Sequence, residues 1–229
     1  VMVSYESSEK VLFSADGFGK FGALSVADDE WDCEARRYYM NIVGKYGAQV
    51  QNLLKKAATL EIKTIAPLHG PILCGDLSHY INQYDIWSSY RPETEGVFIA
   101  YASIYGNTAK AAHALANLLR DKGVKVAITD LARDDRAEAL EDAFRYSRMV
   151  LASSTYDGGI FTPMRDFILD LEHKGYRNRR VGLIENGTWA PMSGRKMREI
   201  LEKMKDITVC EKVLTLKSSF KSSDQDALV

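Results

Sequence analysis

Three short segments of this sequence combine glycine with hydroxyl and amide side chains, the groups that bind small anionic or polar ligands. The first, Ser103–Thr108, follows an apolar run and precedes a stretch with helical periodicity. A helix begins with unpaired backbone N–H groups and the positive end of its dipole, and Gly106 permits close approach of an anion. The segment therefore favours a phosphate site at a helix N-terminus, although the same residues also suit an ordinary turn capped by Thr108.

The second and third segments, Ser153–Gly159 and Glu185–Pro191, have a similar composition, and each adds one large aromatic residue. Tyr156 and Trp189 are suited to flank a flat ring system, or they are surface aromatics of the usual kind. If all three segments follow parallel strands, they meet at one edge of the sheet, where ligands of such sheets bind. We therefore predict one binding site formed by Ser103, Ile104, Tyr105, Gly106, Asn107, Thr108, Ser154, Thr155, Tyr156, Asp157, Gly158, Gly159, Asn186, Gly187, Thr188 and Trp189.

The motifs of several other enzyme classes are missing. The first segment has no lysine of the GxxxxGK[ST] type and no GxGxxG pattern, which disfavours nucleotide triphosphate hydrolysis and dinucleotide binding. Ser153 and Ser154 do not lie in a GxSxG motif, so a hydrolase nucleophile is disfavoured as well. Glu185 is either an acid or base or a residue that shapes its loop. We assign no catalytic side chain.

Asp16 and His69 are the candidate metal ligands. Each follows a short predicted strand and lies beside glycine, in Phe13–Gly19 and in Leu68–Pro71. A carboxylate and an imidazole suit iron, manganese or zinc. Two ligands do not complete a metal site, however, and an aspartate that shapes a turn and a histidine that fills a loop are the alternative interpretations.

The elements that would position the three polar segments alternate strictly between apolar strands and helices. This alternation predicts an α/β domain with a doubly wound, flavodoxin-like parallel sheet of five strands in the order 2-1-3-4-5, covered on both faces. Strands and helices are expected in turn at 97–102, 108–121, 125–129, 136–146, 149–153, 163–173, 181–184, 195–205 and 208–217.

The earlier part of the chain has a different pattern. Strands are expected at 1–5 and 10–14 around a hairpin turn, helices within 29–59 divided near Gly44 and Gly47, a strand at 63–67 and a helix at 77–89. The polar segment 91–96 is the best boundary, which predicts domains at 1–92 and 93–229. Residues 222–229 suit only the first turns of a helix, and the start is equally abrupt. We therefore expect both ends to belong to a longer protein, with the last helix truncated.

Composition excludes several classes of protein. Apolar residues make up 46% of the chain and charged residues 27%, which is typical of globular proteins. The 30 basic and 31 acidic residues create no bulk field, so neither nucleic acid nor a membrane is expected as a partner. The basic cluster 174–180 suits a solvated helix end, or else a nucleic-acid contact. Three cysteines without a CxxC motif disfavour a disulfide framework and favour a reducing cytoplasm.

Longer motifs carry a resemblance to a known family. The segment Ser103–Thr108 resembles the flavin mononucleotide (FMN) phosphate loop of flavodoxins. The runs 155–164 and 176–191 resemble the flavodoxin domain of flavodiiron proteins, A-type flavoproteins that reduce oxygen or nitric oxide. The resemblance extends from about Val1 to the end of the chain. One departure is Ser154, where the family usually has proline, although the backbone donors of the loop remain.

The resemblance implies an FMN-binding flavodoxin-like domain preceded by the C-terminal part of a metallo-β-lactamase-like αββα domain. In such proteins Asp16 would bridge two irons and His69 would be a terminal ligand. The other ligands of that family, including an HxExDH run, are not found in this sequence. The implied partners are a rubredoxin-like donor or a reduced flavin or deazaflavin, with a head-to-tail homodimer or higher homo-oligomer, or a complementary N-terminal chain.

We therefore expect the electron-transfer part of a flavodiiron oxidoreductase. In the full-length parent, electrons would pass from the donor through FMN to a diiron site that reduces oxygen or nitric oxide. One alternative is a stand-alone flavodoxin-like electron carrier without substrate chemistry. Another is a non-catalytic relic of a truncated gene.

Overall fold

The computed structural model describes residues 2–25 and 31–228. Residues 1, 26–30 and 229 lie outside this description, and so does the start of the helical stretch expected from residue 29. The chain divides into two compact units, Val1–Arg91 and Pro92–Val229. The division falls in the polar segment that follows the last helix of the first unit. No helix in the described ranges combines the length and the apolar character that crossing a bilayer requires.

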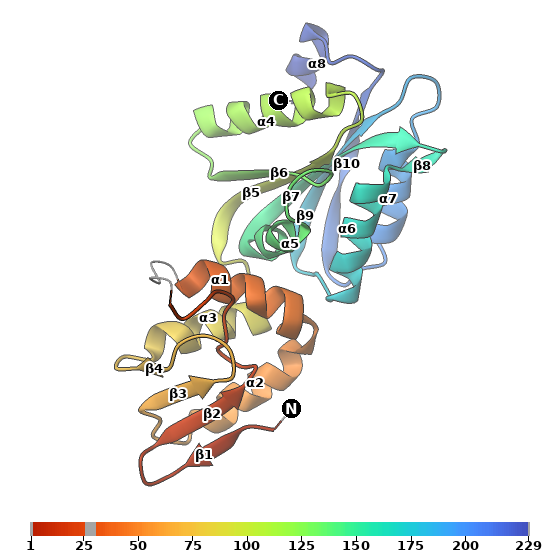
Figure 1. Cartoon of the computed structure of the whole chain (residues 1–229). Coiled ribbons are helices and arrows are strands. Elements are labelled where there is room, and N and C mark those ends of the chain that lie inside the picture. Colours follow the sequence, from red (N-terminus) through yellow and green to blue (C-terminus); the bar gives the residue numbers. More distant parts are fainter. Residues whose placement is uncertain (1, 26–30, 229) are drawn as a thin grey trace. The chain divides into compact units, whose positions relative to one another are not determined.

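The first unit contains one small sheet with helices beside it (Figure 1). In chain order its elements are β1 (Ser4–Glu6), β2 (Val11–Ala15), α1 (Trp31–Tyr38), a π-helical turn (Tyr39–Val43), a 3₁₀ turn (Gly44–Tyr46), α2 (Gly47–Ala57), β3 (Thr64–Pro67), β4 (Leu73–Cys74) and α3 (Ser78–Ser88). The strand order is β1-β2-β3-β4, and only β2 and β3 pair in parallel. Leu12 and Ile65 are buried whereas Phe13 is half exposed, as expected when one face of a sheet is covered.

The helical stretch of the first unit is divided at the glycines, as the sequence predicts. The break is a change of winding and not a loop, because a π turn and a 3₁₀ turn separate α1 from α2. Gly47 begins α2 where that helix approaches α3 closely. A Cβ atom at this position would overlap the carbonyl oxygen of Ser88 and the ring of Tyr90, so glycine is required for the packing.

The second unit is a doubly wound α/β domain, and it confirms the predicted fold class. Its elements are β5 (Thr94–Ala102), α4 (Asn107–Asp121), β6 (Val126–Asp130), α5 (Arg136–Arg145), β7 (Tyr146–Tyr156), β8 (Gly159–Ile160), α6 (Thr162–His173), β9 (Arg179–Asn186), α7 (Ser193–Leu201), β10 (Ile207–Leu216), α8 (Ser222–Gln225) and a 3₁₀ turn (Asp226–Leu228). The parallel strands lie in the order β6-β5-β7-β9-β10, which is the predicted 2-1-3-4-5. In Figure 1, α4 lies on one face of the sheet, and α5, α6 and α7 lie on the other.

One strand of the second unit is not expected from the sequence. β7 continues to Tyr156 and then pairs with β8 as an antiparallel hairpin, with Thr155 opposite Ile160. Asp157 and Gly158 form its turn with φ angles of 48° and 67°. Two successive positive φ angles define the type I′ turn, for which Asp-Gly is a favoured pair. The segment 154–159 is therefore a hairpin and not an irregular loop, because its turn chemistry allows the strand to double back.

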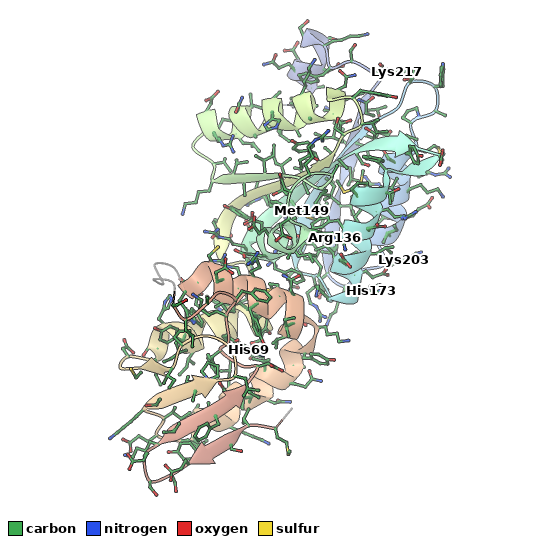
Figure 2. The ribbon with its side chains drawn as sticks, in the orientation of Figure 1. His69, Arg136, Met149, His173, Lys203 and Lys217 are labelled. Atoms are coloured by element: carbon green, nitrogen blue, oxygen red, sulfur yellow. The ribbon has the colours of Figure 1, made fainter. Side chains whose placement is uncertain are left out.

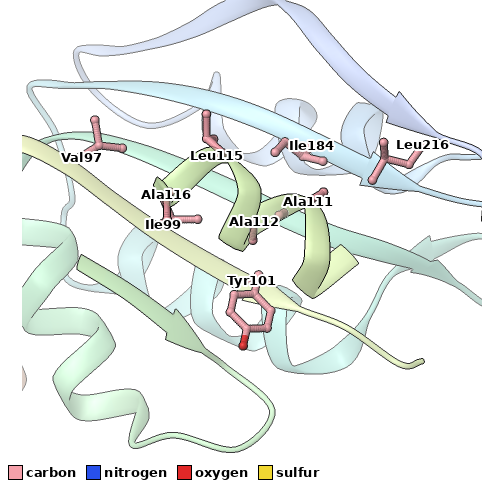
Figure 3. Packing of buried hydrophobic residues seen from close by; sticks show 10 residues of the cluster. Val97, Ile99, Tyr101, Ala111, Ala112, Leu115, Ala116, Ile184 and Leu216 are labelled. Atoms are coloured by element: carbon pink, nitrogen blue, oxygen red, sulfur yellow. The ribbon is translucent and has the colours of Figure 1, made fainter. Parts of the chain in front are cut away.

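The packing of α4 on the sheet places the start of this helix beside the end of β5. A buried cluster joins alanines of the helix to larger side chains of β5, β9 and β10 (Figure 3). Ala111, Ala112 and Ala116 are fully buried, and their small side chains allow the helix to lie close to the strands. Phe220 and Leu228, from the segment after β10, pack against the same cluster.

Candidate functional site

The loop after β5 has the conformation of an anion-binding helix start. Gly106 precedes the first residue of α4 and has a φ of 83°, a left-handed conformation that favours glycine. Its N–H donates a hydrogen bond to Ser103 Oγ at 3.0 Å. The serine therefore closes the loop on itself, and the first backbone N–H groups of α4 lie at the end of the turn, where an anion is stabilised.

Thr108 and Ser154 connect this loop to the end of β7. The hydroxyl oxygens of the two residues lie 3.0 Å apart, and either one can donate. Thr108 has no exposed surface, so its hydroxyl is held in place by the packing of α4. The strands β5 and β7 are neighbours, with Ala102 opposite Ser153, which brings the two loops together.

Glu185 shapes the third loop, which resolves the choice that the sequence leaves open. Its buried carboxylate accepts a hydrogen bond from the Gly194 N–H and another from the Thr215 hydroxyl, both at 2.8 Å. Gly194 is the second residue of α7, so the negative charge lies at the positive end of that helix. The side chain is therefore committed to positioning the loop 186–192 between β9 and α7.

Thr155 joins the second loop to the start of α7. Its Oγ1 accepts hydrogen bonds from the N–H groups of Met192 at 3.0 Å and Ser193 at 3.2 Å. The Ser193 hydroxyl in turn donates to the carbonyl oxygen of Ser153 at 3.0 Å. The second and third loops are thus held together by polar contacts between residues about 40 positions apart.

A pocket of about 150 Å³ lies where these loops meet. It includes most of the residues predicted to bind a ligand. The lining consists of Ser103, Ile104, Tyr105, Asn107, Thr108, Ser154, Thr155, Asn186, Gly187, Thr188 and Ser218. Gly106 belongs to the loop that forms one wall, whereas Tyr156, Asp157, Gly158, Gly159 and Trp189 do not line the pocket.

The chemistry of the lining fits the phosphate end of a flavin mononucleotide. Hydroxyl, amide and backbone groups line the pocket, and no lining side chain carries a charge. A phosphate would meet neutral donors and the positive end of α4, with no carboxylate in the wall to repel it. The left-handed Gly106 has open space around its Cβ position, so the loop presents its backbone without a side chain.

Three aromatic side chains of these loops are exposed. Tyr105 is 91% exposed, Trp189 is 95% exposed and Tyr156 is 48% exposed. Tyr156 packs against Phe161, with the ring centroids 5.8 Å apart. Large exposed rings beside a polar pocket are typical of a surface that binds a ligand or a partner. That Tyr156 and Trp189 flank a flat ring stays a prediction.

Ser218 is the pocket residue that the sequence interpretation missed. It follows β10 and has a φ of 71°, which is uncommon for a residue other than glycine. The Asn186 side chain donates from Nδ2 to the Ser218 carbonyl oxygen at 2.9 Å and accepts the Ser218 N–H at 3.0 Å. No local motif marks Ser218, but the end of the fifth strand lies at the same sheet edge as the other loops, and this rule points to it.

Part of the basic cluster 174–180 has a structural role at the opposite edge of the sheet. The buried Arg179 donates from Nε to the carbonyl oxygen of Tyr146 at 2.7 Å, and it also contacts the carbonyl of Phe144 near the end of α5. Burial lowers the pKa of Arg179 from its ordinary value. Figure 2 shows His173 and Lys203 at this edge, while Lys217 lies at the other edge, near Ser218. Arg179 is therefore structural, and it lies away from the pocket.

Asp16 and His69 lie close together in the first unit. They follow the paired strands β2 and β3, and Asp16 Oδ1 is 3.9 Å from His69 Nε2. The Tyr38 hydroxyl donates to Asp16 Oδ1 at 3.2 Å. Burial, and then the Asp16 carboxylate, raise the pKa of Tyr38 to about 12. The described residues contain no group of three or more His, Cys, Asp or Glu side chains that could hold a metal.

Known proteins resemble the chain in sequence. The family model described as flavodoxin matches residues 99–227. A nitric oxide reductase of Moorella thermoacetica is 31% identical over 193 residues, which are 80% of this chain and 47% of that protein. The chain spans about half the length of the curated relatives that it matches.

Solved structures share its fold over almost the whole chain. The rubredoxin oxygen:oxidoreductase of Desulfovibrio gigas is 24% identical with a TM-score of 0.91, and the match covers 99% of this chain and 59% of that one. A flavodiiron protein of Giardia intestinalis has the same identity and TM-score, with 99% and 57% covered. Both units therefore have counterparts within the same solved chains, as the resemblance of the sequence implies.

Proposed function

The chain belongs to the flavodoxin family, and on that premise we propose that its second unit binds FMN at the pocket between β5, β7 and β9 and transfers electrons in a flavodiiron oxidoreductase. The uncharged pocket at the N-terminus of α4 carries this proposal. It lies beside the point where the strand order reverses, which is the usual ligand site of open α/β sheets. The similarity to a nitric oxide reductase and to flavodiiron folds supports it.

Each loop of the pocket has a role in this proposal. Ser103, Asn107 and Thr108 hold the phosphate through hydroxyl, amide and backbone N–H donors. The bound flavin supplies reversible electron transfer, and the protein supplies position and electrostatics. The residues proposed to contact the ring and its edge are Ser154, Thr155, Tyr156, Asp157, Gly158, Gly159, Asn186, Gly187, Thr188 and Trp189.

The first unit is proposed to be the C-terminal part of a metallo-β-lactamase-like domain. Asp16 and His69 follow adjacent strands and lie 3.9 Å apart, which suits two ligands of one diiron site in the full-length parent. The parent would deliver electrons from a rubredoxin-like donor, or from a reduced flavin or deazaflavin, to oxygen or nitric oxide. We propose a head-to-tail homodimer or higher oligomer, or a complementary N-terminal chain, as its assembly.

A second function is favoured by the extent of the family match, because the flavodoxin model covers residues 99–227 and none of the first unit. On this alternative the second unit serves as a stand-alone electron carrier. Metal analysis separates the two proposals, since a carrier has no need of iron. An odd number of cysteines without a CxxC motif suits the reducing cytoplasm that we propose as the compartment.

The proposal is tested by titrating the flavin-free chain with FMN and with flavin adenine dinucleotide. We expect a yellow one-to-one complex with FMN and much weaker binding of the dinucleotide. The reason is that the pocket suits a terminal monophosphate and the sequence has no second glycine-rich loop for an adenylate. Equal affinity for the two flavins in calorimetry, or no binding of either, would contradict the assignment of the pocket.

A further inference from the structure

The ends of β9 and β10 are joined beyond their regular pairing. The Gly187 N–H donates to the carbonyl oxygen of Leu216 at 3.1 Å. The Asn186 amide then bonds both the N–H and the carbonyl oxygen of Ser218, at 3.0 and 2.9 Å. Asn186 is only 8% exposed. By donating and accepting one hydrogen bond each, its side chain continues the backbone pairing of the two strands past the end of the sheet.

These bonds hold Ser218 in the wall of the pocket. The residue keeps a left-handed φ of 71°, a conformation that persists for non-glycine residues when the surroundings impose it. The two hydrogen bonds from Asn186 are the contacts that hold Ser218 in this conformation. Because the Asn186 amide binds both main-chain groups of Ser218, this side chain positions the wall, and the backbone of Asn186 is the part proposed to contact the flavin.

The segment after Ser218 also packs against the hydrophobic cluster beside α4. Phe220 and Leu228 pack against the buried cluster that α4 forms with the sheet, and Leu216 is a member of that cluster. The same helix carries Thr108 and begins at the phosphate loop. The segment 217–228 is therefore attached both to the third loop, through Asn186, and to the helix of the first loop.

We propose that Ser218 forms a fourth wall of the flavin pocket as part of the packed segment 217–228, that Asn186 is its positioning residue, and that flavin binding and the ordering of this segment are coupled. The inference rests on the proposed binding of FMN. A ligand that contacts Ser218 binds best when the wall is in place, and it stabilises that state by its differential affinity. Coupling of this kind is reciprocal, so loosening the wall weakens the binding of FMN.

Hydrogen exchange of the whole chain, with and without FMN, tests the coupling. We expect saturating FMN to slow exchange of the amides in 217–228 at least tenfold, with a ceiling of about a hundredfold at an FMN concentration about 100 times the Kd. Asn186→Ala removes both bonds to Ser218. It should speed exchange of this segment in the flavin-free chain and weaken FMN binding about tenfold. Asn117→Ala, an exposed substitution on α4, is the matched control and should change neither quantity.

Ser218→Gly distinguishes the role of the Ser218 hydroxyl from the role of its main-chain groups. Glycine adopts a positive φ without strain, and Asn186 bonds only main-chain atoms of residue 218, so the wall is kept while the hydroxyl is lost. We expect FMN affinity to fall severalfold, with the protection of 217–228 retained.

The outcomes distinguish this inference from the proposed function. If the wild-type chain binds FMN but exchange in 217–228 does not change, the fourth wall is wrong while the FMN site stands. If FMN does not bind, the proposed function fails and the coupling fails with it. If Asn186→Ala leaves exchange in the flavin-free chain as in the wild type, Asn186 is not the positioning residue.

Discussion

The hydroxyl oxygens of Thr108 and Ser154 lie 3.0 Å apart, across the ends of the neighbouring strands β5 and β7. One hydroxyl must donate to the other, which leaves the acceptor's own proton free to point into the pocket. The pair therefore adds a side-chain hydroxyl donor to the pocket that both residues line.

Thr108→Val tests the phosphate site. Valine keeps the shape of the buried side chain and removes the hydroxyl, and a hydrogen bond to a charged group contributes about 1.5–3 kcal/mol. We expect the dissociation constant of FMN to rise about tenfold or more in a fluorescence titration. Thr208→Val, on an exposed position of β10, is the control. An unchanged constant for Thr108→Val would place the phosphate elsewhere.

Glu185→Gln tests the anchor of the third loop. The substitution removes a buried negative charge from the start of α7 and weakens the bonds to Gly194 and Thr215. We expect the free energy of unfolding to fall by about 1–2 kcal/mol in urea titrations. Glu199→Gln on the same helix, where the carboxylate is exposed and forms only surface ion pairs, should change it by less than about 0.5 kcal/mol. Equal effects would argue against a special role for Glu185.

Tyr176→Phe tests the alkaline stability of the second unit. Burial raises the pKa of Tyr176 above its ordinary value, and the Tyr176 hydroxyl donates a weak hydrogen bond to the Met149 sulfur at 3.9 Å. The neutral Tyr176 phenol makes its full contribution to the free energy of unfolding below about pH 10, the pKa of an unfolded tyrosine. This contribution is lost as the pH rises above that value.

The variant should therefore match the wild type near pH 7 and exceed it at pH 11 by about 1.4 kcal/mol, because phenylalanine cannot ionise in the unfolded chain. Urea unfolding at the two pH values measures this difference. Tyr105→Phe, which changes a phenol that is 91% exposed, controls for the loss of a hydroxyl. A constant difference between pH 7 and pH 11 would refute the assignment.

Metal analysis tests the first unit. On the proposed assignment Asp16 and His69 supply two ligands, and a retained pair of irons needs several more with supporting contacts. We expect the isolated chain to hold much less than one iron and to consume no oxygen. Adding a separately expressed fragment that carries the remaining ligands of the metal domain should restore iron binding. Stoichiometric iron in the chain alone would require ligands that the described residues do not bring together.

The sequence by itself determined the α/β class of the second unit, its strand order and the convergence of three loops. Alternating apolar strands and helices leave few topologies, because parallel strands need crossovers of one hand. The order 2-1-3-4-5 then brings the loops after β5, β7 and β9 to one edge whatever their side chains do. In the first unit the sequence placed Asp16 and His69 each after a strand, and the parallel pairing of β2 with β3, seen only in the structure, brings them together.

Only the tertiary structure decided what the individual side chains in these loops do. The sequence left Glu185 as either an acid or base or a residue that shapes its loop. The structure decides for the loop, because the Glu185 carboxylate accepts a hydrogen bond from Thr215, 30 positions away. Ser218 is held in the pocket wall by hydrogen bonds to Asn186, 32 positions away. The turn at Asp157 belongs to a hairpin, because β7 pairs with β8. Periodicity reports which face of an element is buried. It does not report which distant residue satisfies a buried polar group, since that partner is set by the way separate loops pack against one another.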